Sequence, residues 1–197
     1  MDTAYAASPT RSCVVSFMAD EAAKLAIVNA VDEPIATIKV QHICDRCGIS
    51  RGTFYNHFHS KYDMRPWFLE TVMQKTLDRI GRDLTWEEGV ATFFEVAGAA
   101  ERFNRMTAMG PEASVAAHRR RVIIATLESY RGVRPTKEQR LLIEHYVDCE
   151  ARLCSRWCAG ELPGDARVVR ELFVASVPPW LYGAMEGDGC QRARCCA

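Results

Sequence analysis

The sequence has little that would bind the protein to a membrane, and it has no overall positive charge that would attract an anion such as nucleic acid. No apolar run approaches the roughly 20 residues that span a bilayer, and no basic stretch with a following apolar run and cleavage site marks a signal peptide. We therefore expect a cytoplasmic protein without membrane contact. Basic and acidic side chains number 25 each, so the net charge is zero. Any binding to nucleic acid then requires a local patch of positive charge.

The signatures of common enzymes and of β-structure are also missing. There is no glycine-rich phosphate-binding loop after a strand, no nucleophile elbow and no His-Glu-x-x-His sequence. We therefore predict neither an enzyme nor a cofactor. No alternating strand pattern or internal repeat competes with the helical periodicity, and apolar residues make up 48% of the chain. The composition is that of an ordinary globular protein, and the pattern predicts an all-α fold.

Nine cysteines stand out in the composition. In a cytoplasmic protein they are expected to be reduced thiols. Cys44 and Cys47 form a Cys-x-x-Cys, which suits a redox or zinc site in another setting, but here both fall on the apolar face of a short predicted helix. Farther along, Cys154 and Cys158 are spaced to hold a metal on one helix face. We predict no metal site, and a cysteine-based redox or metal sensor stays an alternative.

The first third of the chain has the pattern of several short helices. One is predicted from Ser16 to the residues before Pro34. A second is predicted to bury one face and to stop at Gly48, since a left-handed residue fits there. Its apolar face consists of Val40, Ile43, Cys44 and Cys47. Ser50 is placed to cap a third helix that runs to about Phe58.

The rest of the chain is also predicted to be helical. Ser60 and Asp63 form a capping-box variant for a fourth helix, expected from about Lys61 to Arg82. Further helices are predicted at about 86–109, 111–130, 136–159 and 165–177, between breaks rich in Gly and Pro. The predicted organisation is a flexible leader (1–11), a small domain (12–64), a larger helical domain (65–186) and a loose tail (187–197).

The second and third predicted helices have the features of a helix-turn-helix. Two helices that cross steeply need small residues at the crossing and a glycine in the turn, which Cys44, Cys47 and Gly48 supply. On the third helix, Phe54 and Phe58 point to one side. The opposite arc has hydrogen-bonding groups and little bulk: Gly52, Thr53, Tyr55 and Asn56. Such a helix can anchor in a core and enter a major groove about 12 Å wide.

Positive charge is concentrated in the same segment. Between Thr37 and Tyr62 four basic side chains stand against a single acidic one, Asp45, which gives a net charge of +3. The four are Lys39, Arg46, Arg51 and Lys61. This segment therefore has the local charge that binding to duplex DNA requires.

The segment from Ile43 to Met64, ICDRCGISRGTFYNHFHSKYDM, resembles the DNA-binding signature of the tetracycline-repressor (TetR) family of bacterial transcriptional regulators. The turn glycine, the capping serine, the Phe-Tyr-x-His-Phe run and the following lysine fall at the family's spacing. The resemblance covers about Ser16 to Leu69. It implies a homodimer that binds double-stranded DNA, commonly as a repressor on a palindromic operator. It also implies a helical C-terminal domain that takes a small-molecule effector and changes the separation of the two DNA-binding domains.

The resemblance further implies which residues contact DNA. The positions are Gln41, Ser50, Arg51, Gly52, Thr53, Tyr55, Asn56, His57 and Lys61. Arg51, Thr53 and Asn56 would face base edges or phosphates. Tyr55, Lys61 and Gln41 would contact the phosphate backbone and so set the register. For His57, a packed side chain and a phosphate contact both stay open.

One position departs from the family. Where Ser or Thr commonly caps the second helix, this sequence has Lys39. Thr37 could supply the missing cap, or Lys39 could instead contact a phosphate, and the sequence does not separate the two.

Beyond Leu69 the resemblance is one of length and helicity. Eight residues could line an effector pocket or simply form the core: Trp86, Phe93, Phe94, Phe103, Met106, Tyr130, Tyr146 and Trp157. The implied dimer interface is about Glu138 to Ala159 and Asp165 to Tyr182, with Pro178-Pro179 shortening the second helix. The segment from Tyr146 to Trp157 with Gly160 also resembles the regulators linked to dihydroxyacetone kinase operons.

Two more interpretations follow from charge. His118 to Arg121 is a basic run on a predicted helix, and we expect it to be a solvated face. The net charge of zero leaves open a protein-binding coregulator that keeps the fold without affinity for DNA. The polar arc of the third helix is the feature that separates this alternative from a DNA-binding regulator.

Overall fold

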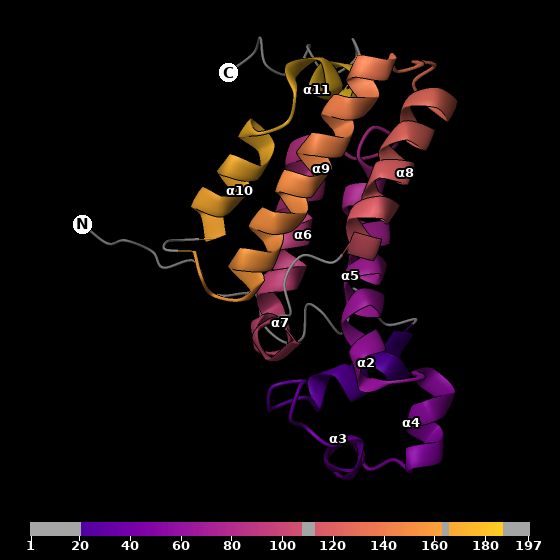
Figure 1. Ribbon diagram of the computed structural model, residues 1–197, viewed down its shortest axis with the longest axis vertical. Coiled ribbons are helices and arrows are strands. Elements are labelled where there is room, and N and C mark those ends of the chain that lie inside the picture. The colour runs from indigo at the N-terminus through magenta and orange to yellow at the C-terminus, as the bar shows by residue number, and fades with distance from the viewer. Residues whose placement is uncertain (1–20, 108–112, 163–165, 187–197) are drawn as a thin grey trace, which may run out of the picture. The chain divides into compact units, whose positions relative to one another are not determined.

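The computed structural model describes residues 21–107, 113–162 and 166–186 (Figure 1). In these ranges the chain forms ten α-helices and no strand, which confirms the all-α prediction. The helices are α2 (Ala22–Asn29), α3 (Val40–Cys47), α4 (Arg51–His57), α5 (Met64–Lys75), α6 (Trp86–Ala99), α7 (Glu101–Thr107), α8 (Ala113–Ser129), α9 (Lys137–Cys158), α10 (Ala166–Ala175) and α11 (Pro179–Glu186). Two short 3₁₀ helices, η2 (Lys61–Asp63) and η3 (Leu77–Arg79), flank α5. None of the helices in the described ranges is long and apolar enough to cross a membrane.

The described residues pack as two compact units. The first consists of residues 21–68 and 95–107, and the second of residues 69–94, 113–162 and 166–186. Helices α5 and α6 therefore each contribute residues to both units.

The core of the first unit is built from short helices. Ile43 of α3 and Phe54 of α4 are fully buried, as is Phe68 of α5. The Phe68 ring meets the Phe103 ring of α7 edge-on at 5.2 Å between centroids. Since α7 also accepts a hydrogen bond of 2.7 Å from the Ile35 N–H at its Met106 carbonyl, it is part of the same unit as the helix-turn-helix.

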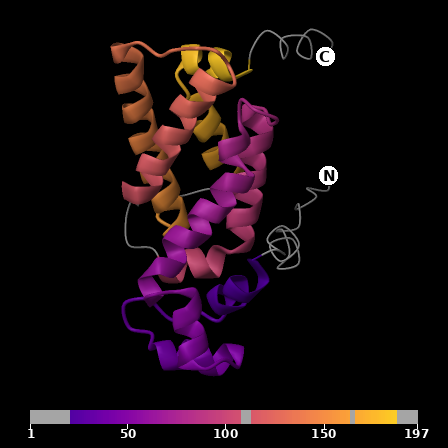
Figure 2. The ribbon, with the colours of Figure 1, turned by 90° about the vertical axis from the view of Figure 1, so that its right-hand side faces the viewer.

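The second unit is organised around α8 and α9, which lie alongside each other in both views (Figures 1 and 2). Thr136 caps α9: its hydroxyl accepts from the Gln139 N–H at 3.3 Å, and the Gln139 side chain accepts from the Thr136 N–H at 2.8 Å. Helix α10 packs on α9. An aromatic cluster joins α6, α9 and α10 and consists of Phe93, Phe94, Trp157 and Phe173.

The fourth predicted helix was expected to reach Arg82, and this was wrong. Helix α5 ends at Lys75, because Thr76 leaves the helical conformation with φ −133° and ψ −89°. The Thr76 hydroxyl donates to the Val72 carbonyl at 2.7 Å. In a continuing helix that carbonyl would accept the Thr76 N–H, so the side chain takes the place of the backbone donor.

The predicted helix at 86–109 is likewise interrupted. It is divided at Ala100 into α6 and α7. The Asn104 side-chain amide donates to the Ala97 carbonyl at 2.8 Å, and in an unbroken helix that carbonyl would pair with the N–H of Glu101. A buried side chain therefore compensates the break.

After Pro178 the chain forms a helix that the sequence analysis did not predict. Helix α11 begins at Pro179, and the first helical position is where proline is favoured, because its missing N–H would have no partner there. The Tyr182 N–H donates to the Pro178 carbonyl at 2.9 Å. The two prolines therefore end one helix and start another.

The basic run from His118 to Arg121 is not a solvated face, and this expectation was wrong. Arg119 is buried and donates from Nη1 to the Leu77 carbonyl at 2.9 Å. His118 bonds Asp78 at 2.6 Å, and Arg120 is paired with Glu144. Only Arg121 is exposed. The partners of this run lie about 24 to 42 positions away in the chain, a distance at which helix periodicity carries no signal.

Candidate nucleic-acid interface

The turn between α3 and α4 has the geometry predicted for a helix-turn-helix. Gly48 ends α3 in the left-handed region, with φ 69° and ψ 32°, and its N–H bonds the Cys44 carbonyl. The Ile49 N–H reaches the same carbonyl at 3.1 Å. Because this left-handed conformation is costly for most other residues, glycine allows the chain to change direction within three residues.

Ser50 caps α4 as predicted. Its Oγ accepts a hydrogen bond from the Thr53 N–H at 3.0 Å and lies 2.9 Å from the Thr53 hydroxyl. The capping bond satisfies one of the backbone donors that a helix start leaves unpaired. Helix α4 therefore starts at Arg51 with a defined orientation.

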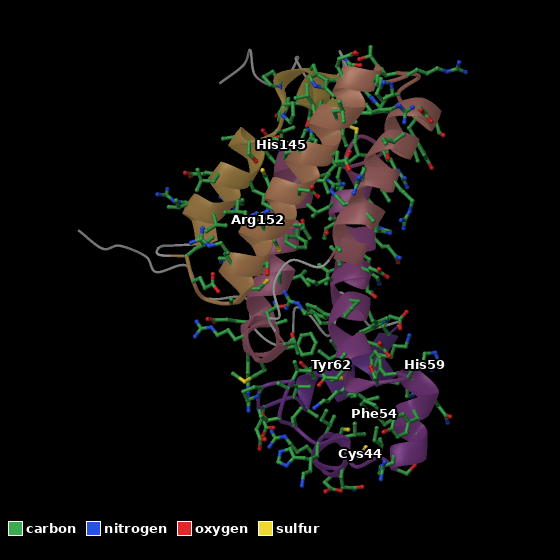
Figure 3. All side chains as sticks on the ribbon, in the orientation of Figure 1. Cys44, Phe54, His59, Tyr62, His145 and Arg152 are labelled. Atoms are coloured by element: carbon green, nitrogen blue, oxygen red, sulfur yellow. The ribbon has the colours of Figure 1, made fainter. Side chains whose placement is uncertain are left out.

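One side of α4 is anchored in the core. Phe54 is fully buried, 5.4 Å from the Tyr55 ring and 6.0 Å from the Phe58 ring between centroids. Figure 3 shows Phe54 on the side of α4 that faces Cys44 of α3. Phe58 in turn meets Trp67 at 5.6 Å. These contacts are why the helix holds its position.

The other side of α4 is open to solvent, as the periodicity predicted. Arg51, Gly52, Tyr55 and Asn56 are exposed, and Thr53 and His57 are half-exposed. The Arg51 guanidinium lies 5.9 Å from the Tyr55 ring centroid, a cation–π contact that holds the two side chains together. On α3, the exposed Gln41 side chain donates to Asp45 at 2.7 Å. The predicted contact residues of α4 thus form one polar surface.

Lys61 is tied to the loop that leads into α3. Its Nζ donates to the Ile38 carbonyl at 2.8 Å and to the Ala36 carbonyl at 3.1 Å. The Thr37 hydroxyl donates to the Pro34 carbonyl at 3.1 Å, which fixes its side chain on the preceding turn and not on α3. The N-cap residue Lys39 makes no side-chain capping bond either. Lys61, from the other end of the motif, therefore fastens the entry to α3.

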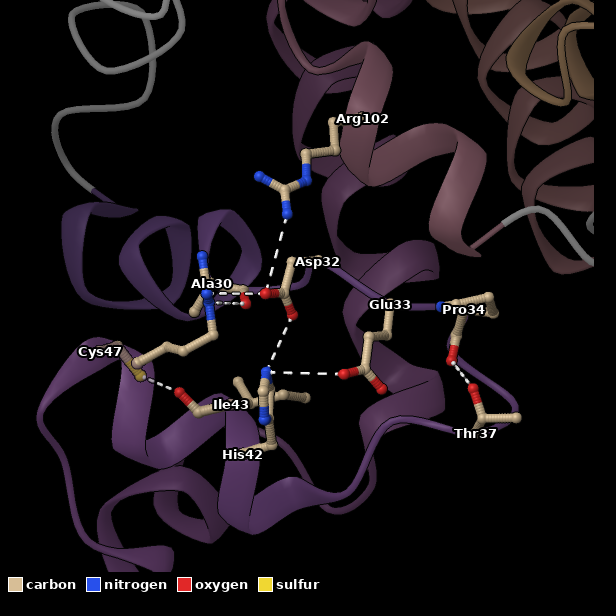
Figure 4. Close-up of polar contacts among 10 residues, drawn as sticks. Ala30, Asp32, Glu33, Pro34, Thr37, His42, Ile43, Cys47 and Arg102 are labelled. Atoms are coloured by element: carbon tan, nitrogen blue, oxygen red, sulfur yellow. Dashed lines mark hydrogen bonds and ion pairs between the residues drawn. The ribbon is translucent and has the colours of Figure 1, made fainter.

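Asp32 holds α3 in place, and the sequence analysis missed it (Figure 4). Its carboxylate lies 2.7 Å from Arg46 Nη1, 3.1 Å from His42 Nε2 and 3.8 Å from Arg102 Nη2 of α7. Arg46 Nε also donates to the Ala30 carbonyl at 3.1 Å. The sequence analysis includes Arg46 only in the local net charge, and nothing local in the sequence pairs it with a residue 14 positions earlier.

The same cluster contains the one group of possible metal ligands found within the described ranges: Asp32, Glu33 and His42. Two guanidinium groups already face Asp32. Since they neutralise the carboxylate that a cation would need, the geometry supports a positioning role for Asp32 and not a metal site.

The cysteines of the Cys-x-x-Cys pair belong to the folded core of the motif. Cys44 is fully buried, and the Cys47 thiol donates to the Ile43 carbonyl at 2.9 Å. Burial raises the pKa of both thiols. Because the thiolate is the reactive and metal-binding form, a raised pKa favours the structural interpretation of this pair over a redox or zinc site.

The eight residues considered for an effector pocket differ in their surroundings. Five are buried: Trp86, Phe93, Phe94, Phe103 and Tyr146. Met106 and Trp157 are half-buried. Tyr130 is 61% exposed and lies beneath the Arg82 guanidinium at 4.7 Å. Phe103 and Met106 belong to the first unit and the other six to the second.

The residues that form this helix-turn-helix also match a known protein family. Residues 30–65 match the family model described as bacterial regulatory proteins, tetR family. The chain carries a TetR-family helix-turn-helix domain. The match spans α3, the turn at Gly48 and α4, and so contains every residue for which the sequence implied a DNA contact. No curated protein matches the chain.

The coarse function follows from the TetR domain. Its helix-turn-helix makes the protein a DNA-binding transcriptional regulator. The match ends at Arg65, well before the segment from Tyr146 to Trp157. It therefore gives no support to the dihydroxyacetone-kinase-linked subgroup or to any other.

Proposed function

We propose that this TetR-domain protein is a homodimeric, ligand-responsive repressor that acts in the cytoplasm on a palindromic operator. The observation that carries the proposal is α4, which buries Phe54 and leaves Arg51, Gly52, Tyr55 and Asn56 exposed on its opposite side. A helix that is fixed on one side and small and polar on the other fits a major groove.

The proposed contacts divide by chemistry. Arg51 and Asn56 discriminate bases, because guanidinium and amide groups can form paired hydrogen bonds with base edges, and Thr53 faces a base edge or a phosphate. Tyr55 and Gln41 contact phosphates. The Lys61 ammonium group has three N–H donors. Two of them bond to carbonyls, so one is left for a phosphate. Ser50 and Gly52 lie at the start of α4, and half-exposed His57 lies at its end.

Loss of Arg51 tests the role of α4. In Arg51→Ala, affinity for DNA sequences selected by the wild-type protein is expected to fall about 5- to 150-fold, the equivalent of about 1–3 kcal/mol for one good base contact. Fluorescence anisotropy with the selected duplex, at fixed salt, measures the change. Arg121→Ala is the matched control, since it removes the same charge from an exposed position of α8. An equal loss of affinity in both variants would contradict the proposed contact.

The proposed dimer rests on apolar side chains that a monomer would leave in water. Leu141 and Leu142 of α9 are 61% and 46% exposed, and Val168 and Leu172 of α10 are 42% and 54% exposed. The interface proposed from the sequence, Glu138 to Ala159 and Asp165 to Tyr182, contains α10 and all of α9 except Lys137. Exposed apolar side chains on two neighbouring helices are what a surface covered by another chain would have.

A charge placed on α10 tests the dimer. Leu172→Glu is expected to convert a dimer into a monomer at micromolar concentration, because association would bury an unpaired carboxylate. Light scattering coupled to gel filtration gives the mass. Ala125→Glu adds the same charge at an exposed position of α8 and should leave the dimer intact. A wild-type protein that elutes as a monomer of 22.1 kDa would refute the proposed assembly.

The competing function is a coregulator that binds protein instead of DNA, and the net charge of zero favours it. The two functions differ in one measurement. Wild-type protein that shows no affinity for any duplex at low ionic strength, where phosphate contacts are strongest, would support the coregulator.

A further inference from the structure

A second polar surface of the first unit lies where the loop before α3 meets η2. It consists of Lys39, Lys61 and Tyr62, which we call the flanking patch. Lys39 is exposed, Lys61 is half-buried, and the Tyr62 side chain is 47% exposed. Two of the three residues carry a positive charge, and the third adds a hydroxyl group at the surface. Lysine and tyrosine side chains are among the groups that commonly contact DNA phosphates.

The parts of the patch come from separate segments of the chain and are joined by hydrogen bonds. Lys61 Nζ donates to the Ile38 carbonyl at 2.8 Å, 23 positions away. Ile38 directly precedes Lys39, so the Lys61 ammonium group lies next to the backbone from which the Lys39 side chain starts. Lys61 Nζ also lies 5.2 Å from the Tyr62 ring centroid, a cation–π contact. The three side chains therefore belong to one continuous surface.

The outer groups of the patch take no part in holding the fold together. Lys39 is the N-cap residue of α3 but makes no side-chain capping bond. Among the residues that the structure describes, neither the Lys39 ammonium group nor the Tyr62 hydroxyl group has a hydrogen-bond or ion-pair partner. The carboxylate of Asp63, which follows Tyr62, accepts a hydrogen bond from the Ser60 N–H at 2.8 Å. The two outer groups are therefore available to a ligand.

A phosphate backbone fits this arrangement. A lysine ammonium group binds a phosphate as a point charge, and a tyrosine hydroxyl group can donate to a phosphate oxygen. The phosphates of one DNA strand follow each other about every 3.4 Å along the duplex axis. Side chains as close together as those of the patch can therefore contact the same phosphate or adjacent ones.

We propose that the flanking patch binds the DNA backbone beside the groove that α4 enters. Lys39 forms an ion pair with one phosphate, and the Tyr62 hydroxyl group donates a hydrogen bond to a phosphate oxygen. The third N–H of Lys61 binds the same stretch of backbone. The proposal adds Tyr62 to the contact residues and assigns Lys39 the phosphate contact that the sequence left open. It rests on the proposed function, in which α4 lies in the major groove.

Salt dependence tests the Lys39 contact. Each phosphate that a protein neutralises contributes about 0.9 to the slope of log K against log salt concentration. In Lys39→Gln we expect that slope to be less negative by about 0.9 for each protein copy bound, with equal loss of affinity on the selected duplex and on an unrelated duplex. Fluorescence anisotropy over a salt series measures it. Lys137→Gln, which removes the same charge from an exposed position of α9, should keep the wild-type slope. An unchanged slope in Lys39→Gln overturns the proposal.

Tyr62→Phe tests the second contact, since it removes one hydroxyl group and keeps the ring beside Lys61. Affinity should fall about 2- to 10-fold on both duplexes, the usual net value of one hydrogen bond. The salt slope should stay at the wild-type value, because no charge is lost. Tyr130→Phe is the matched control, at a tyrosine that is 61% exposed in the second unit. Wild-type affinity in Tyr62→Phe, or a loss confined to the selected duplex, overturns the proposal.

The Arg51 variant separates this proposal from the proposed function. If Arg51→Ala weakens binding to the selected duplex while Lys39→Gln and Tyr62→Phe bind as wild type does, the patch is refuted and the proposed function stands. If the two patch variants weaken binding to both duplexes while Arg51→Ala does not, the patch stands and base recognition by Arg51 is refuted. Wild-type protein that binds no duplex at low ionic strength overturns both.

Discussion

Phe54→Ala is expected to lower the free energy of unfolding of the helix-turn-helix by about 3–5 kcal/mol, the usual cost of removing a buried phenylalanine ring. Phe54 is fully buried and contacts the rings of both Tyr55 and Phe58. It is the main apolar anchor of a seven-residue helix, and isolated helices of that length are not stable in water. Without it α4 should lose its fixed position, and DNA binding should be lost with it.

Urea denaturation followed by circular dichroism measures this effect, and anisotropy with a DNA duplex measures its consequence. Tyr55→Ala is the control, since Tyr55 is the next residue on the same helix and is 43% exposed. It should cost far less stability while still weakening DNA binding through the lost phosphate contact. If both variants lost the same stability, Phe54 would not be the anchor.

Arg119→Ala is expected to destabilise the second unit by about 3–5 kcal/mol at neutral pH, because removing one partner of a buried ion pair leaves the other charge uncompensated. The substitution would leave Asp78 and Glu150 without the guanidinium that faces both. It would also remove the donor to the Leu77 carbonyl. Arg121→Ala, two residues along α8 and exposed, should change stability by less than about 0.5 kcal/mol.

The pH dependence of this loss has a definite sign. Burial raises the pKa of Glu150 in the folded protein, and Arg119 is the group that opposes the rise. A carboxyl group whose pKa is higher in the folded state stabilises the fold below its unfolded pKa, and this contribution is lost as the pH rises through the folded value. The stability difference between Arg119→Ala and wild type should therefore shrink as the solution is acidified. A difference that is constant or grows towards acid pH would contradict the role of Glu150.

The helix-turn-helix could be predicted from the sequence because the residues that determine it interact with near neighbours in the chain. Gly48 ends one helix through its own backbone conformation, and Ser50 caps the next through a bond to a residue three positions later. The burial of Phe54 and the exposure of Asn56 follow from helix periodicity alone. Interactions between residues a few positions apart can be recognised directly from the residue types and their spacing.

Contacts across the fold decided the rest. The end of α5 at Lys75 and the break at Ala100 are exceptions, since the side chains that replace backbone donors there lie only four and seven positions from their acceptors. The burial of Arg119 depends on Leu77, 42 positions away, and on Glu150. The sequence of a basic run is the same whether its side chains face water or carboxylates. Only the tertiary packing, which brings η3 and α9 against α8, decides that these side chains are buried.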